Sequence, residues 1–217
     1  MAQTESAEKS GTRAEMREET ERAILDAAEV VFAEAGFGGA TMQAIADACG
    51  LPKANLHYYF ASKEKLYRRV VERIFMIWLE AADSFDTEAE PEIALRRYIA
   101  RKMLLSRDYR SGSKVWANEV MHGAPIIQDY LETTLQAWTE TRVAVIRRWI
   151  AEGRIAAIDP KWLLYMIWAT TQHYADFAHQ VETLNRGPLT DAQWQDATET
   201  VCGIVLRGIG LDPGAPR

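Results

Sequence analysis

A run of polar residues follows an apolar segment in the last third of the chain. The stretch WLLYMI at 162–167 has the composition of a buried helix, and WATTQHYADF at 168–177 continues it directly. Burying a polar group without a partner costs about 1–3 kcal/mol, so the polar side chains of this run need partners. Those partners are either other groups of the protein or a bound ligand.

Trp168 and Gln172 are spaced to act together on a ligand, because residues four positions apart share one face of a helix. An indole ring offers a flat stacking surface, and a carboxamide offers a donor and an acceptor side by side. The pair suits a small planar heterocycle with an imide edge, such as a pyrimidine. Trp78, in the apolar stretch IFMIWLE, is a candidate for a second wall. The alternative is a bundle core in which such polar groups bond to neighbouring side chains.

A second set of candidate residues lies on short predicted helices nearer the start of the chain. A first helix is predicted to end at the GFGG stretch of 36–39. Thr41 is then a predicted N-cap for a helix over 42–49, Gly50 forms a turn, and a third helix covers about 52–60. This pattern predicts a helix-turn-helix.

The third of these helices has the chemistry of a recognition helix. Leu56 and Phe60, one turn apart, hold it against the preceding helix, so its other side faces outward. There a small residue permits close approach to base edges, Asn can pair with adenine, and Tyr and Lys can contact phosphate. The candidate DNA contacts are Lys53, Ala54, Asn55, His57 and Tyr58, with Lys63 at the start of the next helix. The alternative is a helical hairpin with a solvated outer face.

The rest of the chain has the pattern of long amphipathic helices. Apolar residues recur at helical spacing, and no segment shows the clean alternation of a strand. The helical segments lie near 90–107, 112–122, 124–153, 160–184 and 190–208. The predicted fold class is therefore all-α.

Charge and residue types exclude several classes of function. The net charge is −6, and residues 1–61 hold 5 Lys or Arg against 10 Asp or Glu, so any nucleic-acid surface is local. Cys49 and Cys202, far apart in helical contexts, indicate reduced thiols and a cytoplasmic protein. No apolar run approaches the roughly 20 residues of a membrane span. No phosphate loop or nucleophile motif indicates an enzyme or a cofactor, and the paired Glu-x-x-His motifs of a metal-binding bundle are missing.

The stretch FGGATMQAIADACGLPKANLHYYFASKEKLY at 37–67 resembles the DNA-binding signature of the TetR family of transcriptional regulators. The resemblance implies an N-terminal DNA-binding unit and a ligand-binding, dimerising helical body behind it. It adds Thr41 to the DNA contacts named above. The family often has Ser or Thr, a cap that can also touch phosphate, where this chain has Pro52, so the resemblance does not imply that contact here.

The body of the chain resembles the uracil- and thymine-responsive repressors of the same family, over about residues 20–185. The resemblance is carried by IWLE, LLSRDY, NEVMHGAP and IDPKWLLYMIWATTQHYADFAHQVE. It implies an effector pocket formed by Trp78, Trp168, Thr171, Gln172 and His173. It also implies that the last two helices pair with a second copy of the chain.

These features predict a cytoplasmic TetR-type homodimer, a repressor that binds a pseudo-palindromic site on double-stranded DNA under the control of uracil or thymine. We expect a disordered segment at 1–18, the three-helix helix-turn-helix domain at 19–64, a multi-helix ligand-binding and dimerisation bundle at 65–209, and a flexible tail at 210–217. Two alternatives remain open. One is a regulator of the same type with another effector, and the other is a helical ligand-binding protein without a DNA function.

Overall fold

The computed structural model describes residues 2–81, 85 and 90–211, with side chains from residue 14 onward. Every helical segment predicted from the sequence has a counterpart, and no strand occurs in these ranges, so the predicted all-α class is confirmed. The chain divides into two compact units, Met1–Arg73 and Ile74–Arg217. This division lies inside helix α4, Lys63–Glu80, and the expected boundary at 64/65 lies in the first turn of the same helix.

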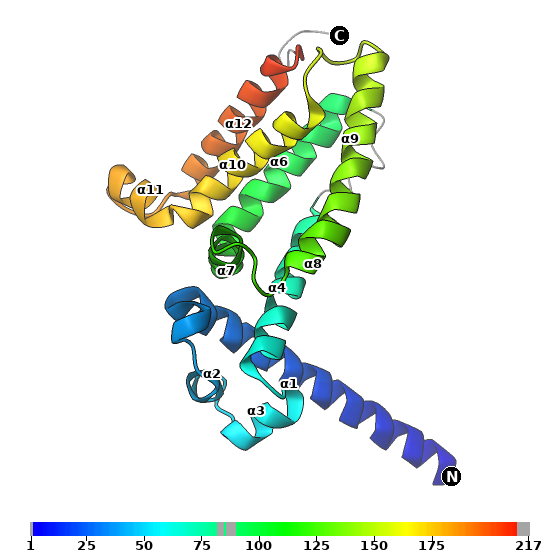
Figure 1. Cartoon of the computed structure of the whole chain (residues 1–217), viewed down its shortest axis with the longest axis vertical. Helices are drawn as coiled ribbons and strands as arrows, with labels where there is room; N and C mark the ends of the chain where they lie inside the picture. Colours follow the sequence, from blue (N-terminus) through cyan, green and yellow to red (C-terminus); the bar gives the residue numbers. More distant parts are fainter. Residues whose placement is uncertain (1, 82–84, 86–89, 212–217) are drawn as a thin grey trace. The chain divides into compact units, whose positions relative to one another are not determined.

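The first unit contains α1 (Ala2–Gly39), α2 (Met42–Ala48), α3 (Lys53–Tyr59) and the start of α4 (Figure 1). Its core is apolar and tightly closed. Ile24, Phe32, Ile45, Leu56 and Leu66 are all fully buried, and the ring of Phe32 meets Tyr67 edge to face at 4.8 Å. The side chains at helical spacing therefore form the predicted inner faces.

The start of α1 falls in the segment for which the sequence predicts disorder. The sequence predicts disorder over 1–18, whereas α1 is helical from Ala2; residue 1 lies outside the described residues. The segment is rich in Ala, Glu, Lys, Arg and Met, which are good helix formers. Extending an existing helix also needs no new nucleus, so apolar periodicity is not required for the segment to be helical.

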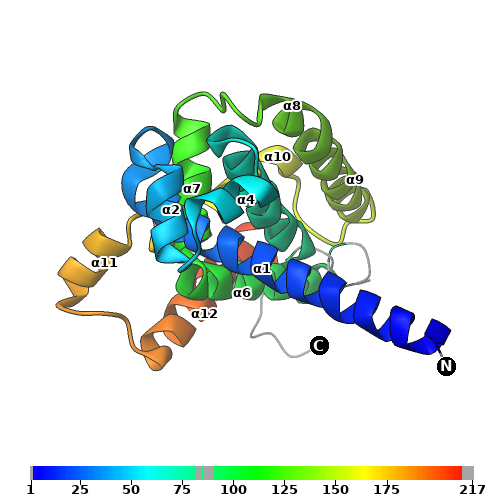
Figure 2. The same cartoon turned by 90° about the horizontal axis from the view of Figure 1, so that it is seen from below.

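The second unit is a helical bundle that continues from α4. Its helices are α6 (Pro91–Asp108), α7 (Arg110–Met121), α8 (Gln128–Tyr130), a π-helical turn (Leu131–Leu135), α9 (Gln136–Ala151), α10 (Pro160–Asp176), α11 (Ala178–Asn185) and α12 (Asp191–Gly208). The predicted single helix over 160–184 is interrupted at Phe177, whose backbone leaves the helical region. The short α11 projects from the bundle between α10 and α12 (Figures 1 and 2).

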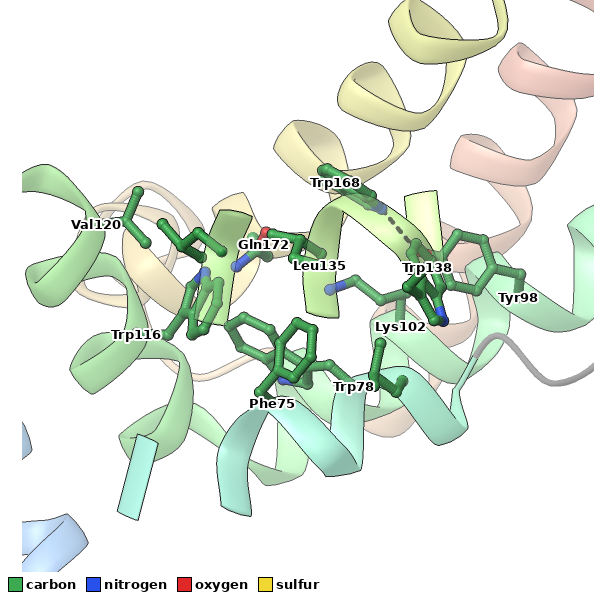
Figure 3. A pocket seen from close by; sticks show the side chains of 12 residues that line it. Phe75, Trp78, Tyr98, Lys102, Trp116, Val120, Leu135, Trp138, Trp168 and Gln172 are labelled. Carbon is green, nitrogen blue, oxygen red and sulfur yellow. Dashed lines mark hydrogen bonds between the residues drawn. The ribbon is translucent and has the colours of Figure 1, made fainter. Parts of the chain in front are cut away.

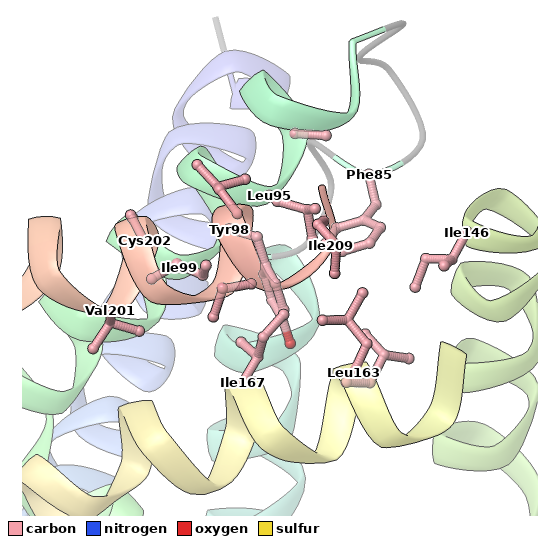
Figure 4. Close-up of a cluster of buried hydrophobic side chains, with 14 of the residues drawn as sticks. Phe85, Leu95, Tyr98, Ile99, Ile146, Leu163, Ile167, Val201, Cys202 and Ile209 are labelled. Atoms are coloured by element: carbon pink, nitrogen blue, oxygen red, sulfur yellow. The ribbon is translucent and has the colours of Figure 1, made fainter. Parts of the chain in front are cut away.

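The core of the second unit lies where α6 packs against both α10 and α12. Tyr98, Ile167 and Val201 are buried there, and Ile146 reaches in from α9 (Figure 4). Within the parts of the chain that the structure describes, no helix is long and apolar enough to cross a membrane.

Candidate functional site

The helix-turn-helix is built by local capping and one glycine. Thr41 Oγ1 accepts a hydrogen bond from the Ala44 N–H at 3.0 Å, which caps the start of α2. Gly50 adopts a left-handed conformation, with φ of 68°, that favours glycine, and the Leu51 N–H then bonds the Ala46 carbonyl at 3.0 Å. The chain can therefore turn from α2 into α3 within a few residues.

The outward side of α3 carries the predicted contacts. Leu56 is fully buried, whereas Lys53, Ala54, Asn55, His57 and Tyr58 are all exposed. Tyr58 is 73% exposed, an unusual state for an aromatic residue in a core-forming segment. The guanidinium of Arg17 lies 6.0 Å from its ring centroid. The sequence did not predict that Arg17 lies beside the recognition helix, because Arg17 falls in the stretch predicted to be disordered.

Lys63 has a different environment from the one predicted. Its Nζ donates hydrogen bonds to the carbonyl oxygens of Phe37 at 2.6 Å and Ala40 at 2.9 Å, and it lies 4.5 Å from the centroid of the Phe37 ring. Carbonyls at the end of a helix have no partner within that helix, so a lysine is a suitable cap. Two of the three donors of the ammonium are thus used within the first unit, and the structure does not show Lys63 as a free phosphate contact.

The second unit contains a cavity of about 220 Å³, below the roughly 300–1,000 Å³ of pockets for drug-sized ligands. Its walls are mostly aromatic and aliphatic, with few polar groups. The lining residues are Phe75, Trp78, Leu79, Tyr98, Lys102, Trp116, Val120, Leu131, Leu135, Trp138, Trp168 and Gln172 (Figure 3). Leu131 and Leu135 come from the π-helical turn, a local distortion that often occurs at functional sites.

Three of the predicted effector residues meet at this cavity. Trp78 from α4 and Trp168 and Gln172 from α10 all line it. The indole Nε1 of Trp168 donates to the Tyr98 hydroxyl at 2.7 Å, which fixes the ring in the wall. The side chain of Gln172 makes no hydrogen bond to any residue that the structure describes, so its amide is open to a ligand.

Thr171 and His173 lie outside the cavity lining. Thr171 is fully buried, and its hydroxyl bonds the carbonyls of Ile167 at 2.8 Å and Trp168 at 3.3 Å in its own helix. His173 is exposed and stacks on Phe177 with centroids 5.0 Å apart. Neighbours of Gln172 in sequence point elsewhere because successive helical residues are turned by about 100°.

Three ionisable groups lie in or near the wall of the cavity, of which Lys102 and Tyr98 line it. Lys102 of α6 is buried at its wall, and burial lowers the pKa of this lysine to about 8, an effect that the Asp176 carboxylate opposes. Burial raises the pKa of Asp176, although a hydrogen bond from Ser113 Oγ at 2.5 Å acts in the other direction. Burial also raises the pKa of Tyr98.

Sequence reasoning missed Tyr98, Lys102, Trp116 and Trp138. Aromatic residues at core spacing look the same in a sequence whether they fill a core or line a cavity. Lys102 could have been identified as a functional residue from the sequence. It follows Tyr98 by one helical turn on the buried stripe of α6, where a charged side chain is rarely found. Among the described residues, no group of three or more His, Cys, Asp and Glu side chains is placed to hold a metal ion.

The helix-turn-helix with an exposed recognition helix, followed by a helical body with a small cavity, defines a ligand-responsive DNA-binding regulator. Residues 24–70 match the family of bacterial regulatory proteins, tetR family, and residues 71–212 match the YcdC-like protein C-terminal region. The chain belongs to the TetR family of transcriptional regulators.

Similar proteins agree with this assignment. The chain is 40% identical over 200 residues to the HTH-type transcriptional regulator RutR of Escherichia coli K12, which covers 92% of this chain and 94% of that protein. It is 37% identical over 93 residues to the HTH-type transcriptional repressor NicS of Pseudomonas putida, which covers 42% of this chain and 44% of that one. These relatives are regulators and not enzymes.

Solved structures share the fold. The ketosteroid transcriptional regulator KstR2 of Mycobacterium tuberculosis matches with a TM-score of 0.68 and 25% identity, covering 87% of this chain and 94% of that one. AibR, solved with isovaleryl coenzyme A and operator DNA, matches with a TM-score of 0.66 and 19% identity, covering 85% and 97%. The likeness to AibR shows the fold alone.

Proposed function

We propose that this regulator is a repressor that releases its operator when a uracil- or thymine-like heterocycle binds in the cavity of the second unit. The observation that carries the proposal is the open carboxamide of Gln172 beside the ring of Trp168. The amide oxygen can accept the imide N–H while the amide nitrogen donates to a neighbouring ring carbonyl. The small volume and the aromatic walls favour a flat ligand of one ring, and the resemblance to pyrimidine-responsive repressors supports the same class.

The DNA-binding half of the proposal rests on α3. Asn55 and Ala54 are exposed on α3 and would meet base edges, while the exposed Lys53, His57 and Tyr58 would contact the backbone or flanking bases. A homodimer would insert two such helices into successive major grooves, about 34 Å apart, at a pseudo-palindromic site in cytoplasmic DNA. Thr41 and Lys63 keep structural roles as caps and can at most add a phosphate contact.

The proposed homodimer uses α11 and α12. Trp194, Val201 and Val205 of α12 are buried within the chain, whereas Ile204 is 60% exposed and Leu184 of α11 is 77% exposed. Exposed apolar side chains on these helices suit a contact with a second copy. Light scattering of the purified chain tests this, and a mass of one chain at micromolar concentration would contradict it.

Helix α4 is the proposed lever between effector and DNA. It carries Lys63, which holds carbonyls of the first unit, and Trp78, which lines the cavity of the second. A ligand that binds better to one arrangement of this helix shifts the population toward it and thereby changes operator affinity.

Titration calorimetry with uracil and thymine tests the effector, with cytosine as the control because an amino group replaces one ring carbonyl and the imide N–H is absent. We expect saturable binding of uracil and thymine by the wild type, weak binding of cytosine, and loss of uracil binding in Gln172→Leu. Asn55, in the first unit, provides the matched control: Asn55→Ala should bind uracil like the wild type. If the wild type binds neither uracil nor thymine, the proposed effector is wrong and the polar residues of 168–177 serve another ligand or the core.

A further inference from the structure

Lys102 is a buried cation that lacks a full partner. Its side chain is only 5% exposed, and its ammonium faces the cavity on the same side as Gln172 (Figure 3). It lies 4.7 Å from the centroid of the Trp78 ring. It makes no hydrogen bond and no ion pair within 4.0 Å to any residue in the described ranges.

Such an arrangement is costly unless it serves a ligand. A buried ammonium needs acceptors, and an aromatic face replaces only part of its hydration. The nearest opposing charge, Asp176, acts on Lys102 only through its field, and its carboxylate already accepts the Ser113 hydroxyl. The Tyr98 hydroxyl in turn accepts the Trp168 indole N–H. The donors of Lys102 therefore remain available to a molecule in the cavity.

Gln172 alone discriminates poorly between uracil and cytosine when the ring is free to turn in the cavity. Rotating the carboxamide by 180° exchanges its donor and acceptor, so it can pair with an imide edge or with the ring nitrogen and amino group of cytosine. An ammonium has donors only and cannot make this exchange. A donor that faces an amino group leaves both groups unpaired, and such a mismatch is strongly rejected in a dry site.

We infer that Lys102 is the specificity-determining contact of the effector, donating a hydrogen bond to the ring carbonyl oxygen that cytosine replaces by an amino group. This inference rests on the proposed function and names a second polar contact for the same cavity. It restricts the effector class to planar rings with two carbonyl oxygens, one paired with Gln172 and the other with Lys102.

The test compares uracil and cytosine on Lys102→Met, which keeps a long apolar stem beside Trp78 but removes the charge. Uracil affinity should fall roughly ten- to hundredfold, the value of one hydrogen bond from a charged donor, while cytosine affinity stays the same or rises. The ratio of the two affinities should thus collapse. Lys114→Met, at an exposed lysine of α7, is the matched control and should leave both affinities unchanged.

Thio-substituted uracils provide a second readout that needs no variant. Sulfur is a weak acceptor, so 4-thiouracil should bind the wild type several-fold more weakly than 2-thiouracil. An unchanged ratio of uracil to cytosine affinity in Lys102→Met would overturn the inference. If that variant does not fold, equal affinity of the wild type for the two thiouracils would overturn it instead. Failure of the wild type to bind uracil at all would overturn the proposed effector and this contact with it.

Discussion

The indole Nε1 of Trp168 lies 2.7 Å from the hydroxyl oxygen of Tyr98, which joins α10 to α6 across the wall of the cavity. Tyr98 is buried, and its ring also packs edge to face on Phe85 at 5.0 Å. The stacking surface offered to a ligand is therefore held by a residue of the core. This bond holds the Trp168 ring in one orientation against the cavity.

Removing the hydrogen bond between Trp168 and Tyr98 should free the Trp168 ring to change its orientation in the cavity wall. In Tyr98→Phe the Trp168 N–H loses its acceptor, so we expect the free energy of unfolding to fall by about 0.5–1.5 kcal/mol and effector affinity to fall several-fold. Thermal denaturation and calorimetry measure the two effects. Tyr165→Phe, at a partly exposed hydroxyl of α10 with no hydrogen bond to a described residue, is the control. Equal uracil affinity in both variants would mean that this bond does not position the Trp168 ring.

Tyr58 should serve DNA and not the effector. Its exposed hydroxyl on α3 suits a phosphate, so Tyr58→Phe should weaken operator binding by about tenfold and leave uracil affinity unchanged. The loss should be similar for different DNA sequences, because phosphate contacts carry no base information. Fluorescence anisotropy with operator and unrelated DNA measures it. An unchanged DNA affinity would remove Tyr58 from the contacts.

Lys63 should act mainly on stability. Its two hydrogen bonds to the carbonyls of Phe37 and Ala40 are lost in Lys63→Met, so we expect the free energy of unfolding to fall by about 1–3 kcal/mol. Lys65→Met, an exposed neighbour whose side chain makes no such bond, should change it little. Were Lys63 only a phosphate contact, the variant would keep its stability and lose salt-dependent DNA affinity instead.

The buried Lys102 predicts a pH dependence of stability. Its pKa falls from 10.5 to about 8 because of burial, so between these values the unfolded chain binds more protons than the folded one. Burying the charged form of Lys102 lowers the free energy of unfolding, and this cost is constant below about pH 8. The free energy of unfolding therefore rises with pH across that window as the lysine loses its proton. Lys102→Met lacks this contribution, while Tyr98 and Asp176, the other titratable groups near the ammonium, remain present in both proteins.

The measurement is urea denaturation of wild type and Lys102→Met from about pH 7 to about pH 10. The variant should be the more stable protein near pH 7, and its advantage should shrink as pH rises above 8. A difference that stays constant with pH would show that Lys102 does not titrate in this range.

The sequence predicted most of the fold because local rules agreed with the packing. The N-cap at Thr41, the turn at Gly50 and the buried Leu56 each follow from residue type and spacing. The start of α1 has helix propensity without an apolar face, which is why the sequence pattern there predicts disorder. The break at Phe177 escaped prediction because no Pro or Gly marks the position.

The cavity was predicted only in part, for a different reason. Trp168 and Gln172 are one turn apart, so periodicity alone brings them together. Trp116, Trp138 and Lys102 reach the same cavity from other helices, and such distant pairings depend on packing that a single sequence does not contain. The π-helical turn that presents Leu131 and Leu135 has no sequence signal of its own.

The central claim is that a ligand in this cavity controls DNA binding, and titrating uracil into the complex of the protein with labelled DNA from upstream of its own gene tests it most directly. Fluorescence anisotropy reports release. We expect uracil to release the DNA from the wild type and cytosine to have little effect. Gln172→Leu should bind the same DNA with wild-type affinity and retain it at every uracil concentration. Release from Gln172→Leu equal to that from the wild type, or no release from either, would contradict the account.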